Sequence, residues 1–172
     1  MNLIVTCARH MEEEAADELV GILDTMGDGA SDITITSMSG ILTARTALDP
    51  VSVSRGMRRM LADEPWAIRY CMRVIPVQET VRADVDAIAD AAARMAHAIP
   101  RDATYRITVE KRNTDISGSS IIASVARNVE NKVSLEHADL IVLVEILEGV
   151  AGISVLHGSD IFSAEKARRE AN

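Results

Sequence analysis

The chain has 172 residues, of which 48% are hydrophobic, and it carries a formal net charge of −8. This hydrophobic content excludes a disordered chain, and the length suits one domain or two small ones. The acidic balance excludes long-range attraction of nucleic acid, although a local basic cluster is enough for a binding groove.

The first part of the chain alternates between strand and helix patterns. Alternating apolar residues predict strands at 2–7, 32–37, 41–47 and 67–75, and apolar residues at helical spacing predict helices at 12–26 and 49–62. In the fourth strand, Met72 falls on the inner face with Ile68, Tyr70 and Val74, and Cys71 on the outer face with Arg69 and Arg73. The order β-α-β-β-α-β is that of the ferredoxin-like fold, which hosts many unrelated activities.

The second part begins near Gln78 with another α/β pattern. Helices are expected at 83–98 and 118–132, and strands at 105–111, 139–147 and 150–156. Ser117 is the expected N-cap of the second of these helices, whose buried face is predicted to contain Ile121, Ile122, Val125 and Val129. The charged tail at 165–172 is expected to fray. We therefore predict an α/β (α+β) protein with a ferredoxin-like domain at 1–77 and a second domain with a mixed sheet at 78–165.

The segment 105–115 is the most informative for function. Its strand ends in Lys111 and Arg112 and turns through Asn113, Thr114 and Asp115 into a helix start. The turn gathers cationic side chains, an amide, a hydroxyl and unpaired backbone N–H groups, which together can hold a phosphate or the end of an RNA strand. In the alternative interpretation, Asn113 and Asp115 only form the turn and the charges are solvated, which is the more frequent situation for such residues.

Together with the segments 140–146 and 151–156, this segment resembles the THUMP family, in particular the stand-alone THUMP proteins that act as adaptors in tRNA cytidine acetylation. The resemblance covers roughly residues 66 to 165. It implies a ferredoxin-like unit before the THUMP unit, and it implies RNA contact for Lys111, Arg112 and Asn113. The partners that it implies are tRNA and an RNA acetyltransferase or another tRNA-modifying enzyme.

The remaining basic residues form weaker groups. Arg106 and Arg127 complete the predicted RNA-binding set. Arg55, Arg58 and Arg59 lie at helical spacing, and Arg69 and Arg73 share the outer face of a strand, so these five form a possible extension of the RNA surface. A solvated face is the ordinary alternative for each group. Asp115 and Ser117 are assigned structural roles, in the turn and at the helix cap.

The sequence offers little sign of catalysis. It contains no HExxH, GxSxG, Walker-type or GxGxxG motif, and its histidines and cysteines follow no metal-ligand spacing, so we expect no cofactor and no metal. The THUMP enzymes carry a catalytic domain after the THUMP unit, where this chain ends, so we expect a non-catalytic adaptor. No apolar stretch reaches the ~20 residues of a membrane span, and we expect a cytoplasmic protein. Two alternatives stay open: a ferredoxin-like oligomerisation or small-ligand-binding regulatory protein without an RNA role, and a small enzyme with an unrecognised site.

Overall fold

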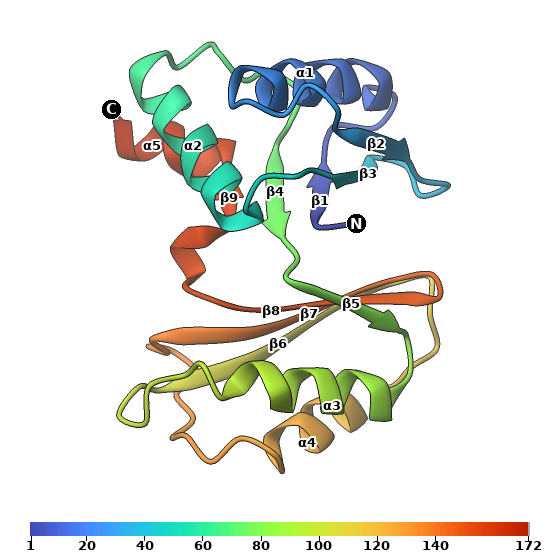
Figure 1. Ribbon diagram of the computed structural model, residues 1–172, viewed down its shortest axis with the longest axis vertical. Helices are drawn as coiled ribbons and strands as arrows, with labels where there is room; N and C mark the ends of the chain where they lie inside the picture. The colour runs from blue at the N-terminus through green and yellow to red at the C-terminus, as the bar shows by residue number, and fades with distance from the viewer. Residues whose placement is uncertain (172) are drawn as a thin grey trace. The chain divides into compact units, whose positions relative to one another are not determined.

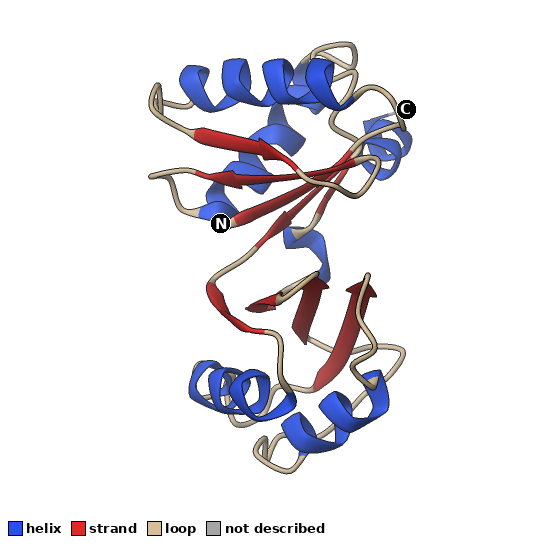
Figure 2. Cartoon of the chain, turned by 90° about the vertical axis from the view of Figure 1, so that its right-hand side faces the viewer, coloured by secondary structure: helices blue, strands red, loops and turns tan. Residues whose placement is uncertain are grey.

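The computed structural model describes residues 1–171 and divides into two compact units. The first unit comprises Met1–Val77 and the chain from Ser159 onward, and the second comprises Gln78–Gly158. Each unit packs helices against its own sheet (Figures 1 and 2). The α/β class predicted from the sequence is confirmed.

The first unit contains a five-stranded antiparallel sheet of order β2-β3-β1-β4-β9. Its elements are β1 (Leu3–Thr6), α1 (Glu12–Thr25), β2 (Asp32–Ile35), β3 (Ile41–Arg45), α2 (Pro50–Asp63), β4 (Arg73–Pro76), β9 (Phe162–Ser163) and α5 (Ala164–Ala171). Up to β4 these follow the β-α-β-β-α-β order expected from the sequence. The two long helices pack on one face of the sheet, where Leu19 of α1 and Met57 of α2 join Val5 of β1 in a fully buried core.

The segment before β4 departs from the prediction. The strand begins only at Arg73, because the carboxylate of Glu18 on α1 accepts the backbone N–H groups of residues 69–71 at 2.6 to 2.9 Å. Those N–H groups are therefore unavailable for a strand partner. Cys71 is buried and Met72 is 53% exposed, the reverse of the predicted faces. The expectation of a strand from residue 67 is wrong.

The last segment also differs from the expectation. A short 3-10 helix, η1 (Gly158–Asp160), leads into β9, whose Phe162 pairs with Val74 of β4 and is fully buried. Arg58 Nη2 donates to the backbone oxygens of Ser159 at 2.7 Å and Ile161 at 3.2 Å. The tail that was expected to fray forms helix α5 as far as residue 171. Asn172 lies outside the described residues.

The second unit contains a four-stranded sheet of order β5-β8-β7-β6. Its elements are β5 (Glu79–Arg82), α3 (Val85–Ala96), β6 (Tyr105–Arg112), α4 (Gly118–Ala126), β7 (Leu140–Leu147) and β8 (Val150–Leu156). The strands β6 and β7 are parallel and the other pairs are antiparallel. Both helices cover the same face of the sheet (Figure 1) and bury an aliphatic core against it. Strand β5 was not predicted from the sequence, because it contains a single apolar residue.

Helix α4 is shorter than predicted. It ends at Ala126, and Asn128 Nδ2 donates to the backbone oxygen of Ser124 at 3.1 Å, which takes up a carbonyl that a continuing helix would use. Ile121 and Val125 are buried as expected, whereas Ile122 is 42% exposed. Because α4 connects two parallel strands, it runs antiparallel to both.

Candidate RNA interface

The predicted site lies at the carboxyl ends of β6 and β7. The parallel register pairs Arg112 with Leu147, so the two strands end at the same edge of the sheet. After Arg112, Asn113 adopts a left-handed conformation (φ 53°), which asparagine tolerates better than most residues and which turns the chain. Ser117 Oγ then accepts the backbone N–H of Ser120 at 3.3 Å, which confirms the predicted cap. We call residues 111–117 the β6–α4 corner.

The two cations of this corner have different partners. Lys111 Nζ donates to the backbone oxygen of Ile116 at 2.9 Å and remains exposed. Arg112 Nη1 donates to Oε2 of Glu145 on β7 at 2.6 Å. The Arg112 side chain is 25% exposed and that of Glu145 is 1% exposed. Lys111 is thus exposed and has a neutral acceptor, whereas Arg112 belongs to a half-buried ion pair.

The β6–α4 corner and the adjoining strand ends carry no net positive charge. The two cations are accompanied by four carboxylates in the corner and on the adjoining strand ends: Glu110, Asp115, Glu145 and Glu148. The first turn of α4 contains no acidic residue, and its Ser119 and Ser120 are exposed. An anion would therefore be held here by short-range donors, namely Lys111, the exposed Asn113 amide and the N–H groups of α4.

Arg106 and Arg127 lie at the other end of the unit. Arg106 stands near the start of β6, where Nη1 donates to the backbone oxygen of Leu135 at 3.4 Å. Its Nε is buried without a hydrogen-bond partner among the described residues. Arg127 follows the last residue of α4, which runs antiparallel to β6, and donates to Ser124 Oγ at 3.3 Å. The structure therefore brings Lys111, Arg112 and Asn113 together but separates Arg106 and Arg127 from them.

The arginines of the first unit are partly engaged in the fold. Arg55 forms an ion pair with Asp160 at 2.8 Å, and Arg58 binds Glu170 at 3.1 Å in addition to its backbone acceptors. These two residues hold the terminal segment. The other three differ in setting: Arg59 is exposed on α2, Arg69 is exposed in the loop before β4, and Arg73 lies in β4 opposite Ser163.

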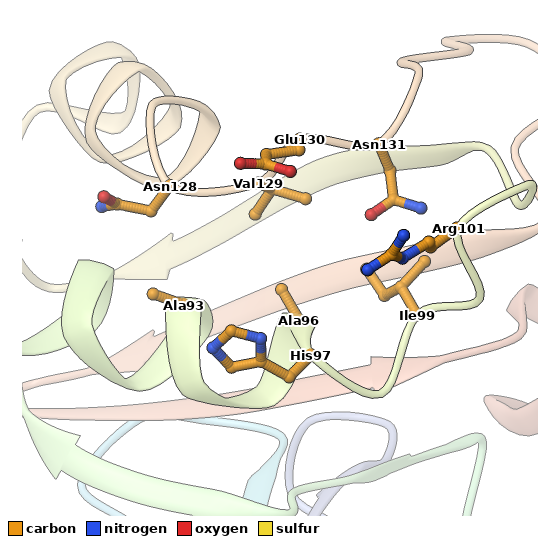
Figure 3. Close-up of a pocket in the computed structure, with 9 residues that line it drawn as sticks. All are labelled: Ala93, Ala96, His97, Ile99, Arg101, Asn128, Val129, Glu130 and Asn131. Atoms are coloured by element: carbon orange, nitrogen blue, oxygen red, sulfur yellow. The ribbon is translucent and has the colours of Figure 1, made fainter.

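The second unit contains a cavity of about 440 Å³ where α3 and α4 end, which the sequence did not predict (Figure 3). Alanine, isoleucine and valine side chains form part of its lining. The polar lining consists of His97, Arg101, Asn128, Glu130 and Asn131. These residues come from two segments separated in the sequence and follow no motif spacing, so no pattern marked them beforehand.

Among residues 1–171, no group of three or more His, Cys, Asp or Glu side chains is placed to hold a metal ion. Cys7 and Cys71 are both buried and form no disulfide. Within the described part of the chain, no helix is sufficiently long and apolar to cross a membrane.

Two comparisons at the sequence level find similarity to THUMP proteins. Residues 82–156 match the model of the THUMP domain. A "THUMP domain-containing protein 1 homolog" of Drosophila melanogaster is 29% identical over 131 residues, which cover 70% of this chain. The match covers 40% of that relative, so this chain corresponds to less than half of its length.

Solved structures share the fold at low sequence identity. PH1313 from Pyrococcus horikoshii Ot3 has a TM-score of 0.69 and 18% identity, with 92% of this chain and 56% of that chain covered. A 4-thiouridine synthetase solved in complex with RNA and with bound ATP has a TM-score of 0.52 and 12% identity, with 91% and 42% covered. These likenesses concern the fold alone.

Proposed function

Because residues 82–156 of this chain form a THUMP domain, we propose that the protein binds tRNA and presents it to a separate RNA-modifying enzyme. The THUMP domain is an RNA-binding module of tRNA modification, and this match is the observation that carries the proposal. The similarity in fold to a synthetase solved with RNA supports it. The partner enzyme that fits best is an RNA cytidine acetyltransferase, as the resemblance to the stand-alone adaptors implies.

Within this proposal, Lys111 and Asn113 make the RNA contacts of the β6–α4 corner. Lys111 exchanges a neutral carbonyl for a phosphate oxygen, and a charge-assisted hydrogen bond is roughly twice as strong as a neutral one. Arg112 is a poorer phosphate ligand, because turning away would leave the carboxylate of Glu145 without its cation at 1% exposure. Arg112 therefore positions the end of β6, and Lys111 is the phosphate ligand.

A filter-binding titration of total tRNA at two salt concentrations tests the binding proposal. Each phosphate contact contributes about −0.7 to −0.9 to the slope of log affinity against log salt, so affinity is expected to fall steeply as salt rises. The absence of binding at low salt would contradict the proposal. It would favour the alternative of an oligomerisation or small-ligand-binding protein, which is supported by the net charge of −8.

A reconstituted reaction tests the adaptor role. The chain is incubated with tRNA, acetyl-coenzyme A and ATP, with and without an RNA acetyltransferase, and the nucleosides are analysed. We expect no acetylcytidine from the chain alone and more product from the enzyme when the chain is added. Acetylcytidine formed by the chain alone would mean that it contains an active site, and an unchanged yield with both proteins would contradict the adaptor role.

A further inference from the structure

We propose that the cavity at the ends of α3 and α4 binds a nucleobase with an exocyclic amino group, from an unpaired nucleotide of the bound RNA. The inference rests on the proposed RNA-binding function and adds to it a second contact, away from the β6–α4 corner. The cavity volume of about 440 Å³ lies within the range of small-ligand sites. It is formed where α3 ends at Ala96 and by residues 128–131, which follow α4.

Asn131 places a hydrogen-bond acceptor in the cavity. Its Nδ2 atom donates to the backbone oxygens of Pro100 at 2.7 Å and Ala103 at 3.1 Å. The two bonds use both amide hydrogens and fix the orientation of the side chain, so Oδ1 remains as an acceptor. Figure 3 shows the side chains of Asn131 and Arg101 pointing toward one another across the cavity. The Asn128 amide makes one such bond, from Nδ2 to the backbone oxygen of Ser124 at 3.1 Å.

The charges of the lining favour a base over a phosphate. The carbonyl ends of α3 and α4 both lie here and carry partial negative charge. Glu130 adds a carboxylate that makes no hydrogen bond or ion pair with another described residue. These acceptors suit the N–H donors of an exocyclic amine, which adenine, cytosine and guanine carry. Uracil has a carbonyl oxygen where these bases have an amine, and that oxygen cannot form a hydrogen bond with these acceptors.

The remaining lining suits the face of the base and its backbone. Arg101 is exposed and forms no ion pair with another described residue, so its planar guanidinium is available to stack on a base or to bind the adjoining phosphate. Ala93 and Ile99 supply apolar surface for the ring. The cavity thus combines acceptors for the base edge, apolar walls for the ring and the exposed guanidinium of Arg101.

Short oligonucleotides and a space-filling variant test this site. Fluorescence anisotropy of labelled oligoadenylate, oligocytidylate and oligouridylate is measured with the full chain, with Ala93→Leu and with Ala123→Leu. Ala93→Leu narrows the cavity without changing charge, and Ala123→Leu makes the same change at an exposed position of α4 outside it. We expect the wild type to prefer adenine and cytosine over uracil. Ala93→Leu should weaken binding of those two by about tenfold, the typical effect of one base contact, and Ala123→Leu should bind as the wild type does.

The outcomes separate this inference from the proposed function. Equal affinity for the three oligonucleotides, or unchanged binding by a folded Ala93→Leu variant, would overturn the base site. Salt-sensitive binding of total tRNA would in that case leave the proposed function standing. If the wild-type chain binds no RNA, total tRNA included, both the base site and the proposed function are overturned. If Ala93→Leu fails to fold, Glu130→Ala replaces it. This variant removes an exposed acceptor of the lining, so the same selective loss is expected for adenine and cytosine, and unchanged binding would overturn the site.

Discussion

Arg112 on β6 donates to Glu145 on β7 at 2.6 Å, and this ion pair gives the two neighbouring cations of the β6–α4 corner different roles. Lys111, one residue earlier, donates to the backbone oxygen of Ile116 and to no carboxylate among the described residues. Of these two adjacent basic residues, Arg112 is therefore held by a neighbouring strand, whereas Lys111 can leave its carbonyl acceptor and bind an external anion.

Lys111→Ala should weaken tRNA binding and leave stability nearly unchanged. One lost phosphate contact lowers the steepness of the salt dependence by roughly one unit, and exposed substitutions usually change stability by less than about 0.5 kcal/mol. Affinity at several salt concentrations and the thermal midpoint are the measurements. Lys166→Ala removes the same charge from α5 in the first unit and serves as the control. Equal effects of the two variants on binding would exclude a specific contact at the corner.

Arg112→Ala should affect stability more than Lys111→Ala does. The change leaves Glu145 without its cation at 1% exposure, at a cost of about 1–3 kcal/mol. Urea unfolding gives the free energy. Adding Glu145→Gln removes the stranded charge and should recover part of the loss. A double variant that is less stable than Arg112→Ala would show that the ion pair is not the source of the effect.

Glu18→Ala should destabilise the first unit. The backbone N–H groups of residues 69–71 lose their shared acceptor, at an expected cost of about 1–3 kcal/mol. Glu18→Gln keeps one oxygen acceptor and should cost less. Glu13→Ala, at an exposed position of the same helix, is the matched control in urea unfolding. A loss of the same size in the control would assign the effect to the helix rather than to the loop.

The stability of the first unit should depend on Asp28 at acidic pH. The Thr46 hydroxyl, which donates at 2.5 Å, and then the Ala47 backbone N–H, which donates at 2.8 Å, lower the pKa of Asp28 below its ordinary value. A carboxyl with a lowered folded-state pKa stabilises the fold above its unfolded pKa of ~3.9 and loses that contribution as pH falls through the folded pKa.

Asp28→Asn should therefore unfold at lower urea than the wild type at neutral pH. The difference between the two proteins should shrink as the pH is lowered from about 4. A difference that stays constant over this range would mean that the charge of Asp28 is not what stabilises its contacts with Thr46 and Ala47.

Both cysteines should be unreactive in the folded protein. Burial raises the pKa of Cys7 and, more strongly, that of Cys71, so little thiolate forms at neutral pH. Titration with a thiol reagent should detect neither thiol under native conditions and both after denaturation in the absence of oxidant. Rapid native reaction would contradict the burial, and a zero count after denaturation would contradict the reduced state.

Much of the local structure was predictable because its causes are local. The acidic first turn and apolar face of α1, the Asp49 cap and Pro50 of α2, and the Ser117 cap of α4 lie within a few residues of the helices that they start. The corner at 111–117 was predictable for the same reason, since its strand end, turn and helix start are consecutive. Arg106 and Arg127 were assigned to the same site by type alone. Arg106 lies near the start of the strand that Lys111 and Arg112 end, and the antiparallel course of α4 places Arg127 at the same far end.

The sequence by itself determined the order of most elements and the THUMP resemblance, because each depends on patterns within short segments. Tertiary structure decided what depends on distant partners. Glu18 converts a strand-like segment into a loop, and pairing with β4 orders a charged tail that would fray in isolation. Glu145, 33 residues away from Arg112, decides which corner cation is available. The cavity likewise exists only because two helices of separate segments end side by side, and no single segment contains enough of its lining to show in the sequence.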